Sequence, residues 1–344
     1  MLEGGPRAAF FLPAAEVMGA TCLERLPQHW QERLARGQAL RQQGYRGRFA
    51  PSPSGALHRG NLRTALVSWL DARLEGGVWL LRLDDLDTPR VVPGAEAQIL
   101  ADLHWLGLHW DDAPIRQSER RGLYNAALAG LRRAGALYPC RCSRRLLADV
   151  SAPHGGLNVY PGLCRDRALG WGGEQGRLPS WRLRLAPGAL HWQERFGPAG
   201  VLDAATAVGD VVLRRADGFI AYHLATALDE LELGITDVVR GLDLWSSSAA
   251  QVAVMGALSL PPPRYGHVPL WCDAEGARLS KRDAAEGLTG LRQRGLDAAA
   301  VVGLLAASLD LVPMGSRLST NELLQQLRRQ PELLTAAVTA PAKI

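Results

Sequence analysis

Lysine is almost absent from this chain of 344 residues, in which only Lys281 and Lys343 occur. Arginine supplies the rest of the 39 basic residues. A skew of this kind reflects coding bias, so the abundance of arginine alone does not indicate RNA binding. The scarcity makes Lys281 conspicuous instead. It lies within Arg-Leu-Ser-Lys-Arg, where a compact ammonium group is suited to meet a phosphate.

Long hydrophobic runs are missing as well. A membrane-spanning helix needs about 20 consecutive apolar residues, and no run in the sequence approaches that length. The apolar segment 8–15 is short and contains Pro13, which argues against a signal peptide. We therefore expect no membrane partner and a location in the cytosol. The net charge of +5 permits a nucleic-acid partner without requiring one.

Cysteine is scarce too, with five residues in the chain. An odd number without a secretion signal argues against a disulfide framework. Three of them, Cys140, Cys142 and Cys164, fall within 25 residues, which favours a structural zinc ion held by three thiolates and a fourth ligand. His154 is the commoner type of fourth ligand in that stretch. The alternative is three reduced cysteines in a loop-rich insert.

Residues 1–44 are set apart from the rest of the chain. Residues 27–43 show helical spacing of Trp30 and Leu34, and Gly44 is placed to end that helix as a C-terminal cap. We expect a partly helical N-terminal extension without catalytic importance. Nothing in the sequence indicates its purpose, and no oligomer is implied.

The next part of the chain alternates between strand and helix patterns. Residues 47–50 and 78–83 are short apolar strand candidates, whereas residues 57–74, 95–106 and 121–134 carry apolar residues at helical spacing. This alternation predicts an α/β fold with a parallel sheet and crossover helices.

Five regions are expected along the chain. They are an N-terminal extension (1–44), the first half of a nucleotide-binding fold (45–130), a glycine-rich inserted module (131–215), the second half of the fold (216–282) and a helical C-terminal region (283–344). Further element candidates are strands at 181–185, 211–214 and 237–240 and helices at 222–231, 288–311 and 323–338.

The most informative stretch is Arg48-Phe-Ala-Pro-Ser-Pro-Ser-Gly-Ala-Leu-His-Arg-Gly-Asn61, which joins the first strand to the helix after it. Its prolines stiffen the turn, and Gly55 and Gly60 permit close approach to the backbone. The free N–H groups at the start of a helix favour an anion. His58 and Asn61 share one face there, and the imidazole can donate a hydrogen bond to a phosphate. Spacing alone equally allows an ordinary turn followed by a helix.

Two stretches resemble the signatures of the class I aminoacyl-tRNA synthetases. The His-Ile-Gly-His signature appears as His58-Arg-Gly-Asn61, and its lead-in is similar to that of the glutamyl branch. Downstream, Arg278-Leu-Ser-Lys-Arg282 resembles the Lys-Met-Ser-Lys-Ser signature. The resemblance implies a Rossmann-type catalytic domain. Other similar stretches are Arg82–Asp87, Ala221–Leu224 with Asp229-Glu230, and Val239–Asp243.

The resemblance implies activation of L-glutamate by ATP with Mg²⁺. The α-carboxylate of glutamate attacks the α-phosphorus and pyrophosphate leaves, a step that needs positioning and charge stabilisation more than a protein nucleophile. The expected catalytic residues are His58 and Lys281, which neutralise charge on the phosphates. The residues expected to bind ATP are His58, Gly60, Asn61, Ser280 and Lys281.

The expected glutamate site follows from the same resemblance. Arg48 and Arg240 are candidates for holding the carboxylates, because a guanidinium fork matches a carboxylate. Asp84 stands where the family has glutamate, and we expect it to meet the α-amino group despite its shorter side chain. Tyr222 is expected to close the pocket with its hydroxyl. The full expected set is Arg48, Phe49, Ala50, Pro51, Ser52, Asp84, Tyr222 and Arg240.

Within the glutamyl branch the chain most resembles a short family, the glutamyl-queuosine tRNA(Asp) synthetases. These lack the anticodon-binding region and attach glutamate to the queuosine base of tRNA(Asp). Only about 60 residues follow Lys281, too few for a stem-contact module plus an anticodon-binding domain. The family's zinc site of three cysteines and one tyrosine matches Cys140, Cys142, Tyr160 and Cys164, which favours Tyr160 as the fourth ligand.

Two other functions stay open on the sequence. One is a truncated glutamyl-tRNA synthetase that charges tRNA(Glu). The other is a non-catalytic tRNA-binding relative that kept the fold. His58, Lys281 and Arg48 argue against the second, whereas Asp84 leaves room for it.

Overall fold

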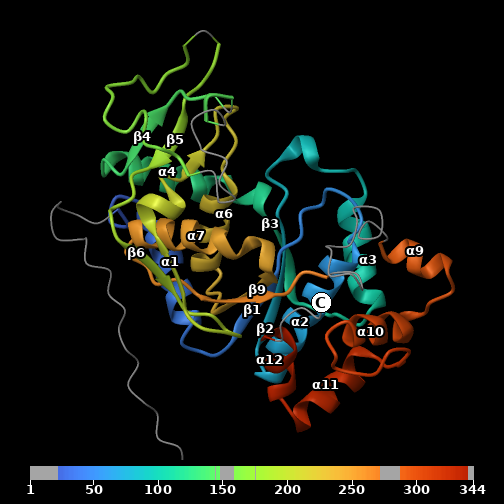
Figure 1. Cartoon of the computed structure of the whole chain (residues 1–344). Coiled ribbons are helices and arrows are strands. Elements are labelled where there is room, and N and C mark those ends of the chain that lie inside the picture. Colours follow the sequence, from blue (N-terminus) through green and yellow to red (C-terminus); the bar gives the residue numbers. More distant parts are fainter. Residues whose placement is uncertain (1–21, 144, 148–158, 175, 272–286, 340–344) are drawn as a thin grey trace, which may run out of the picture.

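A parallel sheet forms the centre of the molecule (Figure 1). The computed structural model describes residues 22–143, 145–147, 159–174, 176–271 and 287–339. Three strands pair in parallel, and they are β1 (Arg46–Phe49), β2 (Val78–Leu83) and β3 (Asp111–Arg116). Strand β2 lies between the other two. This confirms the predicted α/β class.

A second parallel pair lies beside β1. It consists of β9 (Asp237–Gly241) and β10 (Arg264–Val268). The amide of Thr236, just before β9, donates to the carbonyl oxygen of Arg46 at 2.9 Å, so the order across the layer is β3-β2-β1-β9-β10. Successive strands are added on one side of β1 as far as β3, and on its other side from β9 onwards. The boundary between β1 and β9 is therefore a topological switch point. In open α/β sheets, ligands bind at such a switch point, outside the carboxyl ends of the strands.

Helices cover both faces of the sheet. One face carries α2 (Arg59–Leu74), α3 (Ala95–Trp105), α9 (Leu288–Gln293), α10 (Ala298–Ala307), α11 (Thr320–Arg329) and α12 (Glu332–Thr339). The other carries α1 (Gln28–Leu40), α4 (Arg121–Arg133), α6 (Tyr222–Glu232) and α7 (Trp245–Ala257). Side chains alternate along a strand. Leu81 therefore packs on the α2 face, while Leu80 and Arg82 turn towards α6.

The inserted module is antiparallel. Its sheet has the order β4 (Leu137–Cys140), β5 (Ser180–Leu183) and β8 (Val212–Arg214), beside a hairpin of β6 (Ala189–Trp192) and β7 (Gly200–Asp203). A small separate core contains the side chains of Tyr138, Cys140, Tyr160 and Cys164. Short helical turns lie at Thr88–Arg90, Gln117–Arg120, Ala204–Val208 and Leu242–Leu244.

The predicted end of the first helix was wrong. Helix α1 ends at Leu40, and Arg41 rather than Gly44 is its C-cap. The chain leaves the helix through the amides of Gln42 and Gln43, which donate to carbonyls three residues earlier. Gly44 follows this turn with φ near +139°. Among the described residues, no helix combines the length and apolar character that a membrane crossing needs.

Candidate active site

The start of α2, where the sequence predicts phosphate binding, carries a capping box. His58 is its N-cap: the amide of Asn61 donates to His58 Nδ1 at 3.2 Å, and the amide of His58 donates to Asn61 Oδ1 at 3.3 Å. A neutral imidazole that accepts at Nδ1 carries its hydrogen on Nε2. A Cβ on Gly60 would lie 3.0 Å from the His58 ring, so glycine leaves room for the imidazole there. The predicted partners Ser280 and Lys281 lie outside the described residues.

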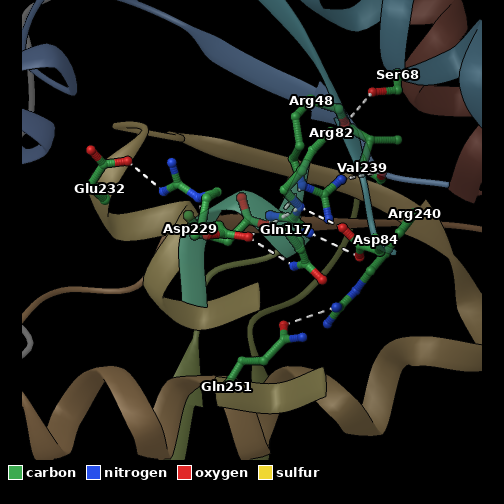
Figure 2. Close-up of polar contacts among 12 residues, drawn as sticks. Arg48, Ser68, Arg82, Asp84, Gln117, Asp229, Glu232, Val239, Arg240 and Gln251 are labelled. Carbon is green, nitrogen blue, oxygen red and sulfur yellow. Dashed lines mark hydrogen bonds and ion pairs between the residues drawn. The ribbon is translucent and has the colours of Figure 1, made fainter. Parts of the chain in front are cut away.

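Arg48 spans the switch point from β1 to β9. Its side chain is buried, with Nε donating to Glu230 Oε1 at 2.8 Å and Nη1 donating to the carbonyl oxygen of Val239 at 3.2 Å. Ser68 supports the strand by donating to the carbonyl oxygen of Arg48 (Figure 2). Burial alone would raise the pKa of Glu230, but Arg48 and Arg82 together hold it below its usual value.

Arg82 and Asp84 form the next layer of this charged cluster (Figure 2). Arg82 is fully buried, and its Nε and Nη2 donate to the two carboxylate oxygens of Asp84 at 2.7 and 3.2 Å. Its Nη1 donates to Glu230 Oε1 at 3.3 Å, so Arg48 and Arg82 share that oxygen. Burial raises the pKa of Asp84 to about 6 despite Arg82. Asp84 also lines a small hollow with Ser52.

Arg240 is held on three sides. Its Nη1 donates to Gln251 Oε1 at 2.9 Å, its Nη2 to Ser248 Oγ at 2.7 Å and its Nε to His267 Nε2 at 3.3 Å. His267 Nδ1 lies 2.9 Å from the Glu194 carboxylate, so the neutral ring donates from Nδ1 and accepts at Nε2. Burial lowers the pKa of His267 even though Glu194 opposes the shift, which favours this neutral form.

The other predicted glutamate-site residues differ in their placement. The ring of Phe49 packs in the core against Trp79, with the centroids 6.2 Å apart, and Ala50 follows it partly exposed. The carbonyl oxygen of Pro51 accepts from the amide of Asp84 at 3.0 Å, which brings the turn to the end of β2. Tyr222 is exposed at the first position of α6.

The cysteine cluster is brought together in the inserted module. The three thiol sulfurs of Cys140, Cys142 and Cys164 lie within 4.8 Å of one another, and Cys142 Sγ is 3.6 Å from Cys164 Sγ. Tyr160 Oη is 3.4 Å from Cys140 Sγ and 3.7 Å from Cys142 Sγ. Sulfurs around a tetrahedral zinc ion are about 3.8 Å apart, given Zn–S distances near 2.3 Å. The cluster therefore fits a metal ion, and His154 lies outside the described residues.

Comparison with known proteins identifies the family. A family model described as "tRNA synthetases class I (E and Q), catalytic domain" matches residues 45–156 and 197–304, more than half of the chain. The chain belongs to the class I tRNA synthetases of the E and Q group. The Rossmann-type class I fold expected from the two signatures is thereby confirmed.

Curated relatives in this E and Q group extend over almost the whole chain. The chain is 59% identical over 306 residues to a glutamyl-Q tRNA(Asp) synthetase of Parasynechococcus marenigrum (strain WH8102), covering 89% of this chain and 97% of the relative. It is 55% identical over 313 residues to one of Prochlorococcus marinus (strain MIT 9313), covering 91% and 97%.

A solved structure of the group is similar in fold. It is a glutamate tRNA ligase from Elizabethkingia meningosepticum in complex with its amino acid, with 28% identity and a TM-score of 0.68. The match covers 82% of this chain, which spans 64% of the length of that ligase.

Several members of the buried charged cluster around Arg48 were not predicted from the sequence. Arg82 and Glu230 lie in stretches that resemble the family, but neither was assigned a role. Asp229 accepts from Gln117 Nε2 at 2.8 Å and from Arg120 Nε at 2.7 Å, which extends the cluster to the start of α4. A usable signal was present, since Arg82 is the one charged residue of an otherwise apolar strand. A charged side chain at a core position is tolerated when it pairs with an opposite charge, so Arg82 indicated a buried ion pair.

His223, in α6, was not assigned a role from the sequence either. Its Nδ1 is buried without a hydrogen-bond partner in the described part of the chain. Burial, followed by the nearby charge of Arg240, lowers the pKa of His223 to about 4. The ring therefore stays neutral beside the predicted carboxylate-binding arginine.

Proposed function

We propose that this chain activates L-glutamate with ATP to glutamyl-adenylate and transfers the glutamate to the queuosine base of tRNA(Asp). The observation that carries the proposal is 55–59% identity to relatives named glutamyl-Q tRNA(Asp) synthetase, over 97% of their length. Because the acceptor is a tRNA, we also infer a cytosolic location.

The charges at the switch point match those of glutamate. Arg48 and Arg240 come from the neighbouring strands β1 and β9, and Asp84 follows the end of β2. Each guanidinium suits one of the two carboxylates of glutamate, and Asp84 suits its ammonium group. Holding these three groups aims the α-carboxylate at the α-phosphorus of ATP, so positioning promotes the reaction.

The N-terminus of α2 is proposed to bind the ATP phosphates. Its free amides and the helix dipole favour anions, and His58 donates from Nε2. Gly60 and Asn61 complete this end of the site. Ser280 and Lys281 are proposed to approach from the second signature. Mg²⁺ bound to the phosphates supplies further charge neutralisation.

ATP–pyrophosphate exchange with glutamate, run without tRNA, tests this function. We expect exchange without RNA, followed by transfer of labelled glutamate to queuosine-containing tRNA(Asp) but not to tRNA(Asp) that lacks the modification. Exchange only with tRNA(Glu) would instead indicate a truncated glutamyl-tRNA synthetase, the alternative that the similarity to a glutamate tRNA ligase supports. No exchange under any condition would indicate a non-catalytic tRNA-binding relative.

Zinc is the proposed metal of the cysteine cluster. Burial raises the pKa of the Cys142 thiol to about 11. A zinc ion would hold the thiolates in their ionised form and tie together a module whose separate core is small. Tyr160 is the proposed fourth ligand.

Replacement of Cys164 with serine is expected to abolish zinc binding. Elemental analysis should find about one zinc per chain in the unaltered protein and in Cys22→Ser, the matched control outside the cluster, but almost none in Cys164→Ser. Tyr160→Phe and His154→Ala distinguish the fourth ligand, because only the variant that lacks it should bind zinc weakly. Equal zinc in Cys164→Ser and the unaltered chain would contradict the site.

A further inference from the structure

Helix α1 lies outside the residues matched by the family model, which begin at residue 45, and it packs directly against α6. The contact brings main chain against main chain. A Cβ on Gly37 would lie 2.0 Å from the carbonyl oxygen of Leu231, and one on Gly234 would lie 2.8 Å from the carbonyl oxygen of Gly37. Glycine therefore lets α1 approach the C-terminal end of α6 more closely than any larger residue would allow.

Arg41, the C-cap of α1, joins two elements beside the proposed glutamate pocket. Its Nη2 donates to the carbonyl oxygen of Glu230 in α6 at 3.2 Å, and its Nη1 donates to the carbonyl oxygen of Pro261, between α7 and β10. Burial lowers the pKa of Arg41 to about 10. Both hydrogen bonds go to main-chain carbonyls rather than to carboxylates.

Arg41 thereby joins α6 to the loop that leads into β10, and α6 and β10 each contact one of the two proposed carboxylate-binding arginines. In α6, the side chain of Glu230 accepts from Arg48. In β10, His267 accepts from Arg240. A shift of α6 relative to β10 would therefore change the spacing between the two guanidinium groups.

Docking of α1 alone does not account for Arg41. The buried side chain of Leu34 already attaches the helix to the core. Burying a guanidinium group costs free energy of folding, so docking alone would be served better by an apolar side chain. Arg33, within α1, also contacts α6, but through a surface ion pair. Arg33 pairs with Glu232 at 2.7 Å near the surface, where its side chain is 40% exposed and such pairs contribute little.

We propose that α1 is a positioning element of the glutamate pocket and that Arg41 is the positioning residue through which it acts. The inference rests on the proposed function, because it assumes that Arg48 and Arg240 bind glutamate. It replaces the expectation that the N-terminal extension has no catalytic importance, at least for the helix and its C-cap.

The test is steady-state ATP–pyrophosphate exchange by the full chain carrying Arg41→Met, which keeps an apolar stem and removes the donors. We expect the KM for glutamate to rise about tenfold and the KM for ATP to change less than about twofold, at a temperature where thermal unfolding shows the variant folded. Arg41→Lys should restore most of the glutamate KM, because its ammonium group can donate to both carbonyls. Arg33→Gln is the control and should leave both KM values unchanged.

A folded Arg41→Met variant with an unchanged glutamate KM would overturn the proposal, as would KM values for glutamate and ATP that rise together. If this variant does not fold, Gly37→Ala replaces it, because the added Cβ must push α1 away from Leu231. The same selective rise is then expected, and an unchanged glutamate KM overturns the proposal. An unaltered chain without exchange activity would overturn the proposed function and this inference with it. An active chain without the selective effect overturns this inference alone.

Discussion

Replacement of Glu230 with glutamine is expected to lower the free energy of unfolding by about 3–5 kcal/mol and to abolish glutamate activation at ordinary substrate concentrations. The carboxylate is fully buried and accepts from Arg48 and Arg82. Glutamine keeps the size but removes the charge. Arg82 still has Asp84, whereas Arg48 has no second ion pair within the described part of the chain and would stay buried without its salt-bridge partner.

Urea unfolding measures this loss. Glu332→Gln, an exposed carboxylate in the first turn of α12, is the matched control and should leave the transition unchanged. Combining Glu230→Gln with Arg48→Met should recover part of the stability, because removing both partners of a buried pair costs less than removing one. A loss below about 1 kcal/mol in Glu230→Gln would show that Arg48 does not depend on this carboxylate.

The central βαβ unit could be predicted closely because its pattern is local. The apolar run 78–83 coincides with β2, and the spacing of Leu62, Leu66 and Leu70 correctly indicated α2. These side chains are buried in one core, so the periodicity of the sequence reflects the periodicity of burial.

Other elements lack such a pattern. Strand β3 reads Asp-Asp-Ala-Pro-Ile-Arg, a polar segment with a proline, because it is an edge strand and most of its residues are partly exposed. Helix α7 was missed for the opposite reason. Ser248 and Gln251 are buried alongside its alanines and valines, so it shows little contrast between faces.

The proposed catalytic residues could be named from sequence, but their pairings could not. Arg48 and Glu230 are 182 residues apart, and the ring of His267 comes between Arg240 and Glu194 only after β10 pairs with β9. Such contacts depend on the order of strands in the sheet. Local spacing indicates that a charge is buried, whereas the tertiary fold determines which charge meets it.

The KM for glutamate is expected to depend on pH through Asp84. The pKa of this carboxyl is about 6, because burial raises it by more than the positive charge of Arg82 lowers it. The ammonium group of glutamate needs the ionised carboxylate, which predominates above that pKa. We therefore expect a constant KM at pH 7–8 and, below pH 6, a rise that approaches tenfold per pH unit. The side-chain carboxyl of free glutamate, with a pKa of about 4.3, stays largely ionised over most of this range.

Exchange assays between pH 5 and 8 with saturating ATP measure this dependence. Asp84→Asn should show a high glutamate KM without the inflection, because the group that titrates has been removed. Asp85→Asn is the neighbouring control: its carboxylate accepts from the amide and hydroxyl of Ser118, so the pH profile should keep its inflection. If Asp84→Asn retains both the KM and the inflection of the unaltered chain, Asp84 does not meet the α-amino group. The inflection would then belong to another group, and the shorter aspartate would have lost the role held by the family glutamate.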